Sequence, residues 1–91
     1  MLDISELRDS AIPFPGVRSG VYFLFDGDKL VYIGESWNCV LRVGEHTRKK
    51  ECKLFGSWNY IGVEEKSDRK AFEDQLVRLY QPKYNKAKFR G

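Results

Sequence analysis

Two apolar runs and the turn between them constrain the fold of this 91-residue chain more than any other feature. Residues 21–25 and 30–33 consist of β-branched, aromatic and aliphatic side chains, which favour strands. Between them stands Asp26-Gly27-Asp28, a combination typical of turns. The sequence therefore predicts an antiparallel β-hairpin. Because both runs are apolar at successive positions, we expect other elements to cover both of its faces.

Segments before and after the hairpin predict two helices. Residues 2–9 favour a short helix capped near Asp3, followed by a loop rich in proline and glycine over residues 10–20. A second helix is expected from a cap at Ser36 to about Lys50. Its expected apolar stripe consists of Trp37, Val40, Leu41 and Gly44.

The second half of the chain completes an α/β pattern. A third strand is expected over residues 58–63, and a last helix from a cap at Asp68 to about Tyr80, where Pro82 ends it. The order β-β-α-β-α predicts a small three-stranded sheet with an antiparallel N-terminal hairpin and helices flanking the sheet. A chain of this length is expected to form a single domain over residues 1–91.

Composition excludes several classes of protein. Hydrophobic residues make up 42% of the chain and aromatic residues 14%, which suffices for a core. No apolar run approaches the length of about 18 residues that a membrane span requires, and the N-terminus lacks the apolar stretch of a signal peptide. Two cysteines cannot form a disulfide framework, so we expect a reducing, cytoplasmic location.

Polar side chains at several positions carry candidate chemistry. Arg42 and His46 lie one helical turn apart, which fits either a solvated polar stripe or a phosphate clamp beside a proton carrier. Glu73 shares a mostly apolar stripe, so it either points toward the body of the protein or lies at its edge and reaches water. Tyr22 and Tyr32 are each explained by strand propensity alone.

In combination, these residues resemble the signature of the GIY-YIG nucleases. Gly20-Val21-Tyr22 is followed, after nine intervening residues, by Tyr32-Ile33-Gly34. The resemblance covers roughly residues 18–86. The further positions that fit the family in the same order are Ser36, Asn38, Arg42, His46, Glu73 and Asn85.

The resemblance implies a site that hydrolyses phosphodiester bonds. Tyr22 resembles the tyrosine that positions or deprotonates the attacking water, and Tyr32 the one that binds phosphate or shares the proton relay. Arg42 resembles the arginine on the scissile phosphate, and His46 the residue that accepts or relays the proton. Glu73 resembles the single carboxylate ligand of a divalent metal, Mg²⁺ or Mn²⁺. The remaining position, Asn85, resembles a residue that braces the site by hydrogen bonds.

The implied function is a metal-dependent DNA endonuclease, and the alternative is a non-catalytic nucleic-acid-binding module with the same fold. Targeting is expected from a partner protein or from a homodimer. With a net charge of +3, the chain is only mildly basic, but its basic residues are clustered. Tyr84 and Phe89 interleave the last cluster and are candidates to stack on bases. The residues expected to contact phosphates are Arg48, Lys49, Lys50, Lys83, Lys86, Lys88 and Arg90.

Hairpin register tests whether the two tyrosines can share a site. A tight two-residue turn without a bulge would put Tyr22 and Tyr32 on opposite faces, because side chains alternate along a strand. We therefore predict either a three-residue loop over 26–28, which would pair Tyr22 directly with Tyr32, or a bulge. Three residues depart from the expected pattern: Val21 replaces the middle Ile of the first tripeptide, Glu35 is acidic, and Gly44 lies inside a helix. We expect Gly44 to allow close packing against the sheet.

Overall fold

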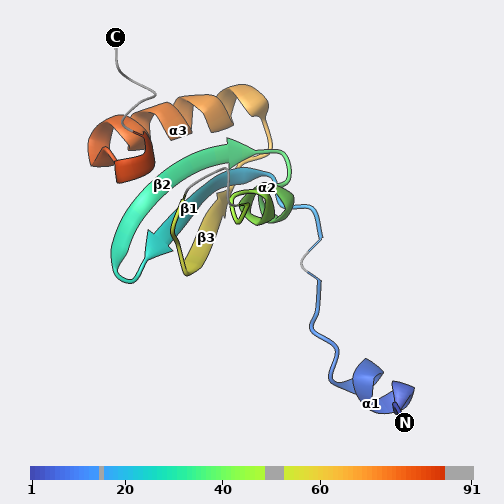
Figure 1. Cartoon of the computed structure of the whole chain (residues 1–91). Helices are drawn as coiled ribbons and strands as arrows, with labels where there is room; N and C mark the ends of the chain where they lie inside the picture. The colour runs from blue at the N-terminus through green and yellow to red at the C-terminus, as the bar shows by residue number, and fades with distance from the viewer. Residues whose placement is uncertain (15, 49–52, 86–91) are drawn as a thin grey trace.

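A three-stranded antiparallel sheet with β1 at its centre organises the fold (Figure 1). The computed structural model describes residues 1–14, 16–48 and 53–85. The strand order is β2-β1-β3, so β1 pairs with β2 on one side and with β3 on the other. In chain order the elements are α1 (Ile4–Asp9), β1 (Gly20–Asp26), β2 (Lys29–Ser36), α2 (Cys39–Glu45), β3 (Ser57–Gly62) and α3 (Lys66–Tyr80).

A bulge sets the register of the hairpin. Leu24 pairs with Tyr32, whereas Phe25 pairs with Leu30, so Val31 is an extra residue on β2. The turn itself is tight, and Gly27 supplies the positive φ of 62° that it requires. The predicted bulge is therefore confirmed, whereas the alternative three-residue loop is wrong.

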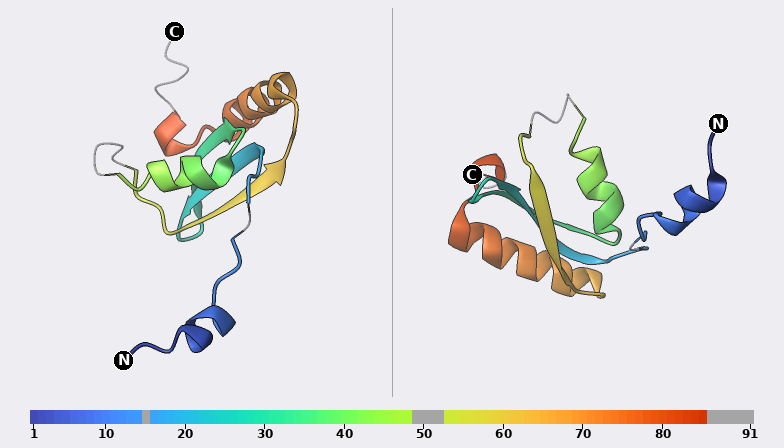
Figure 2. Two further views of the ribbon diagram at one scale, coloured as in Figure 1. Left: turned by 90° about the vertical axis from the view of Figure 1, so that its right-hand side faces the viewer. Right: turned by 90° about the horizontal axis from the view of Figure 1, so that it is seen from below.

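Helices α2 and α3 cover opposite faces of the sheet, as the apolar pattern of the hairpin predicted (Figure 2). On the α2 face, Tyr22, Leu24 and Val31 pack with Cys39 and Val43 of the helix. On the α3 face, the buried residues are Val21, Ile33 and Val77. Alternation along β1 and β2 thus divides a single apolar hairpin between two small cores.

Helix α2 is shorter than expected at both ends. It begins after Asn38, whose Oδ1 accepts the Leu41 N–H at 3.2 Å. The cap expected at Ser36 is wrong because the Ser36 hydroxyl instead accepts the Asn38 N–H at 3.0 Å, in the turn before the helix. The helix ends at Glu45, and residues 46–48 form a turn, so the helix expected to run to about Lys50 is wrong at this end.

The buried face of α2 also differs from the expected apolar stripe. Cys39 and Val43 face the core, whereas Trp37, which precedes the helix, and Leu41 are 62% and 56% exposed. A Cβ on Gly44 would meet no described atom within 4 Å, so the expected close packing at this glycine is wrong. The stripe was misplaced because its first member is not in the helix.

The remaining boundaries lie close to those expected. Helix α3 begins at Lys66, after Glu65, which makes no side-chain cap, so the cap expected at Asp68 is wrong. Asp68 still lies in the first turn, where a carboxylate complements the helix dipole. The helix ends at Tyr80 as predicted, with Gln81 left-handed. Strand β3 is shifted by one residue from the expected range 58–63.

The N-terminal arm extends away from the sheet (Figure 1). Its helix α1 is capped as predicted, because Asp3 Oδ1 accepts the Glu6 N–H at 3.3 Å. No residue of α1 is buried. Among the described helices, none is both long and apolar enough to cross a membrane.

Candidate active site

Tyr22, Tyr32 and His46 form an aromatic cluster on the α2 face of the sheet. The ring centroids lie 6.1 Å apart for the two tyrosines, 5.7 Å for Tyr22 and His46, and 5.0 Å for Tyr32 and His46. The bulge at Val31 brings the tyrosines together, since it shifts the register so that both point to one face. The prediction that Tyr22 and Tyr32 lie on the same face of the sheet is thus confirmed.

A glycine makes room for the Tyr22 ring. Tyr22 pairs across the hairpin with Gly34, not with Tyr32. A Cβ built on Gly34 would lie 2.4 Å from the Tyr22 Cζ and Oη atoms, far inside van der Waals contact. The last glycine of the second tripeptide is therefore a packing requirement of the first tripeptide's tyrosine.

The Tyr22 hydroxyl and His46 Nε2 are 2.8 Å apart and hydrogen-bonded. Both side chains are buried, and His46 is the residue that caps the C-terminal end of α2. Burial raises the pKa of Tyr22 well above its ordinary value, with a further increase from Tyr32, while Arg42 opposes the shift. Tyr22 is thus a neutral phenol at neutral pH, and His46 is its immediate proton partner.

Two cationic side chains lie near this cluster. Lys53 Nζ stands 4.9 Å from the centroid of the Tyr32 ring, a cation–π contact. Arg42, on α2, has an electrostatic influence on Tyr22, and its Nη1 is 3.9 Å from Glu45 Oε1. Both side chains of that ion pair are about one-third exposed, at 36% and 38%, so the pair holds Arg42 only weakly.

Glu73 is buried on α3, with 6% of its surface exposed. Of the two orientations left open by the sequence, the carboxylate therefore takes the one toward the body of the protein. No group of three or more His, Cys, Asp or Glu side chains suited to a metal occurs in the described part of the chain. A single carboxylate oxygen donor suits Mg²⁺, which retains several waters and takes further oxygens from phosphate. The donor set is therefore compatible with such an ion.

Asn85 joins the end of the described chain to the outer edge of β2. Its Oδ1 accepts the Ile33 N–H and its Nδ2 donates to the Ile33 carbonyl, both at 2.8 Å. Ile33 stands between Tyr32 and Gly34, so Asn85 satisfies the edge of the strand that carries the second tripeptide. A buried amide thus replaces a neighbouring strand at this point.

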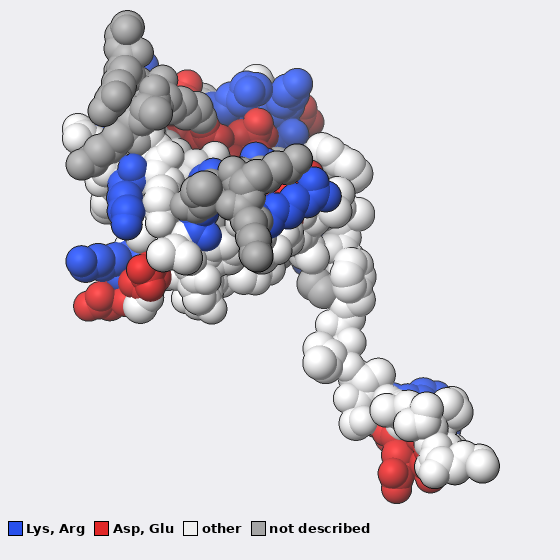
Figure 3. All heavy atoms as spheres, viewed as in Figure 1, with Lys and Arg blue, Asp and Glu red and all other residues white. Residues whose placement is uncertain are grey.

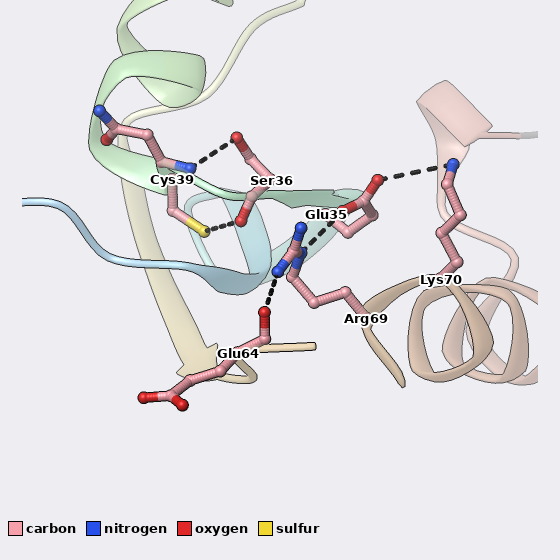
Figure 4. Close-up of polar contacts among 7 residues, drawn as sticks. Glu35, Ser36, Cys39, Glu64, Arg69 and Lys70 are labelled. Carbon is pink, nitrogen blue, oxygen red and sulfur yellow. Dashed lines mark hydrogen bonds and ion pairs between the residues drawn. The ribbon is translucent and has the colours of Figure 1, made fainter. Parts of the chain in front are cut away.

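Arg69 neutralises the acidic residue that the sequence left unexplained (Figure 4). Its Nε donates to Glu35 Oε2 at 3.0 Å, and its Nη1 donates to the Glu64 carbonyl. Lys70 Nζ adds an ion pair at 3.6 Å. Sequence reasoning missed Arg69, although an acid at the end of an apolar strand signalled the need for a basic partner.

Cys39 belongs to the same region of the structure (Figure 4). Its Sγ donates to the Ser36 carbonyl at 3.8 Å. Burial raises the pKa of this thiol to about 11, so it is a neutral packing residue rather than a nucleophile at neutral pH.

The expected phosphate-contacting residues are only partly within the described chain. Arg48 and Lys83 are exposed, while residues 49, 50, 86, 88 and 90, together with Phe89, lie outside the described residues. Tyr84 packs partly buried against the α2-side core, and its hydroxyl accepts the Leu54 N–H, while its expected stacking on a base stays a prediction. Basic side chains on the viewed face form separate groups, some beside acidic ones (Figure 3).

Comparison with known proteins agrees with the family resemblance of the sequence. The family model of the GIY-YIG catalytic domain matches residues 18–85. UvrABC system protein C from two strains of Porphyromonas gingivalis is 34% identical over an alignment of 77 residues, and the match covers 75% of this chain. The chain spans 13% of the length of these relatives.

Solved structures agree in fold. The GIY-YIG N-terminal endonuclease domain of UvrC from Thermotoga maritima, bound to its catalytic magnesium, superposes with a TM-score of 0.64 at 20% identity, covering 93% of this chain and 99% of that one. A point mutant of that domain bound to its catalytic divalent cation gives the same TM-score over 93% and 98% of the two chains. The sheet, the helices and the matched residues are those of a GIY-YIG catalytic domain. This chain belongs to the GIY-YIG family.

Proposed function

We propose that this domain hydrolyses phosphodiester bonds in DNA with the help of Mg²⁺, using Tyr22 and His46 as its proton-handling pair. The observation that carries the proposal is the buried 2.8 Å hydrogen bond between the Tyr22 hydroxyl and His46 Nε2. It gives the Tyr22 hydroxyl a direct hydrogen-bonding partner on the face that Tyr22 shares with Tyr32.

Proton transfer in this arrangement runs through Tyr22 to His46. In the tautomer with Nε2 unprotonated, the Tyr22 O–H donates to His46. The phenol oxygen then retains lone pairs that accept a proton from an attacking water. Because the pKa of Tyr22 is raised, a phenolate does not form first; Tyr22 gives its proton to His46 as it receives one from water.

Positive charge from α2 and from a metal held on α3 is proposed to stabilise the charge on the phosphate. The phosphodiester is an anion, and its transition state concentrates further charge on the non-bridging and leaving oxygens. Arg42, with its planar guanidinium, is proposed to contact the scissile phosphate, and Tyr32 to hydrogen-bond it. Glu73 would hold the metal, which supplies electrostatic stabilisation of the developing charge when bound.

Targeting and location are part of the proposal. The Porphyromonas gingivalis relatives are components of a UvrABC system, and this chain matches 13% of their length. We propose that a partner protein or a second copy of the chain directs it to its site on DNA. A DNA substrate also agrees with the cytoplasmic location expected from the sequence.

Nicking of supercoiled plasmid tests the proposal. We expect wild-type protein to convert supercoiled to open-circular DNA with Mg²⁺ or Mn²⁺ and to stop when EDTA is added. Glu73→Gln should abolish nicking, whereas Asp74→Asn, an exposed neighbour on the same helix, should not. Binding without nicking under all metal conditions would favour the non-catalytic module, and nicking that survives Glu73→Gln would overturn the metal assignment.

A further inference from the structure

Strand β3 carries two aromatic side chains on the same face as the active-site cluster. Across β1, Trp58 pairs with Leu24, which in turn pairs with Tyr32. Tyr60 pairs with Tyr22 in the next row. Directly paired residues project from the same face of a sheet, so β3 extends the face that holds the two tyrosines and His46.

The two β3 aromatics form a stack with one exposed member. The Trp58 and Tyr60 rings are 6.1 Å apart at an interplanar angle of 27°. Tyr60 is half-buried and packs against the α2-side core, which gives it a structural role. Trp58 is 37% exposed, so part of a large aromatic surface faces solvent beside the active site.

We infer that Trp58, supported by Tyr60, is a stacking site for an unpaired base of the DNA substrate. This inference rests on the proposed nuclease function and specifies its substrate class. Aromatic side chains bind nucleic acid by stacking on the face of a base. Inside a duplex that face is covered by the adjacent base pair, so the site takes a base in a single-stranded, looped or splayed segment.

Charge and spacing support this occupant. Strands lie about 4.8 Å apart, so Trp58 stands two strands, or roughly 10 Å, from Tyr32 in the same row. Lys53 lies over the Tyr32 ring, and Arg42, on α2, acts electrostatically on Tyr22 on the same side of the sheet. A strand whose phosphate binds near Tyr32 therefore meets basic side chains, and a base beside that phosphate meets Trp58.

Binding measurements with cleavage-deficient protein test the inference. In a Glu73→Gln background with EDTA present, the dissociation constants for a fluorescent single-stranded oligonucleotide and for a blunt duplex are measured by anisotropy. Trp58→Leu, which keeps an apolar side chain on the strand but removes the aromatic face, should weaken single-strand binding about 10-fold. It should leave duplex binding unchanged.

Two further variants serve as controls. Trp58→Phe retains an aromatic face and should restore most of the single-strand affinity. Trp37→Ala removes the other tryptophan, which is 62% exposed but precedes α2, and should not change the affinity. In Trp37→Phe protein, the fluorescence of Trp58 should be quenched by the single strand and not by the duplex.

Unchanged single-strand affinity in Trp58→Leu, or an equal loss for single strand and duplex, would overturn the inference. Melting temperatures of all variants show whether a loss of affinity is caused by unfolding. If it is, the inference is tested by the quenching of Trp58 fluorescence in Trp37→Phe protein, and no quenching by the single strand would overturn it. The proposed function fails separately, if wild-type protein does not nick DNA with either metal while Trp58-dependent binding persists.

Discussion

At the scale of single residues, the environment of the Tyr22 hydroxyl determines the chemistry of the site. Its ring lies over Gly34, its oxygen contacts His46, and burial raises its pKa. Gly34 and His46 both stand more than ten positions from Tyr22 in the sequence. The identities of the site residues could be predicted by family resemblance, whereas the direct bond between Tyr22 and His46 required the fold.

Alkaline unfolding should report the burial of Tyr22. The unfolded chain releases the phenolic proton near pH 10, whereas the folded chain retains it to higher pH. The folded state then binds more protons, so the free energy of unfolding falls as the pH rises past about 10. Cys39, with its pKa raised from 9.0 to about 11, contributes a decline of the same sign from a lower pH.

We expect Tyr22→Phe to flatten the decline above about pH 10, because phenylalanine has no proton to release. Urea denaturation of wild type and variant between about pH 8 and pH 11 measures how the free energy of unfolding changes with pH. The Cys39 contribution is common to both proteins and cancels in the comparison. Parallel curves for the two proteins would show that Tyr22 titrates alike in the folded and unfolded chains.

Gly34→Ala should damage the site through packing. The added Cβ would lie 2.4 Å from the Tyr22 ring, so the ring must move. We expect a loss of stability of about 1–3 kcal/mol, together with a large loss of nicking rate as the hydroxyl leaves His46. In Gly44→Ala, the new Cβ meets no described atom, and we expect a gain of up to about 1 kcal/mol from helix propensity. Equal behaviour of the two variants would disprove the packing argument.

At the scale of elements, local patterns were predictable and long-range contacts were not. The hairpin, its coverage on two faces, the Asp3 cap and the end of α3 follow from periodicity and from residues within a few positions. The Asn85 amide bonds Ile33, 52 positions away, and Arg69 bonds Glu35, 34 positions away. No local pattern specifies such pairs, and the start of α2 was misjudged because Ser36 and Asn38 are both good caps.

Asn85→Ala should loosen the edge of β2. It removes the donor and the acceptor that satisfy the buried Ile33 backbone, and each unsatisfied group costs about 1–3 kcal/mol. We expect a total loss of roughly 2–5 kcal/mol in urea denaturation. Asn59→Ala, at an exposed position of β3, serves as the control and should stay within about 0.5 kcal/mol of wild type. A similar small change at Asn85 would mean that water replaces the amide.

At the scale of the whole molecule, helix α1 of the N-terminal arm lies away from the folded body (Figure 1). No residue of α1 is buried. The chain that follows the arm is attached to the folded body, because the Arg18 carbonyl accepts the Cys39 N–H at 2.7 Å. The nuclease fold is therefore built by the sheet and the two helices on its faces.

Removal of residues 1–14 should leave the free energy of unfolding within about 0.5 kcal/mol of the full chain. Urea denaturation of the two proteins, followed by circular dichroism, is the measurement. A destabilisation well beyond that range would show that the arm packs on the body in solution.

The most direct test of the account is a double-mutant cycle on the single-turnover rate of DNA nicking, with Tyr22→Phe, His46→Phe and the two changes combined. If the hydroxyl and the imidazole act as one proton relay, each single change should lower the rate by about 10²–10⁴-fold. The combined variant should then be no slower than the slower single variant. Rate losses that multiply, or a single variant as fast as wild type, would contradict the relay on which the proposed mechanism is built.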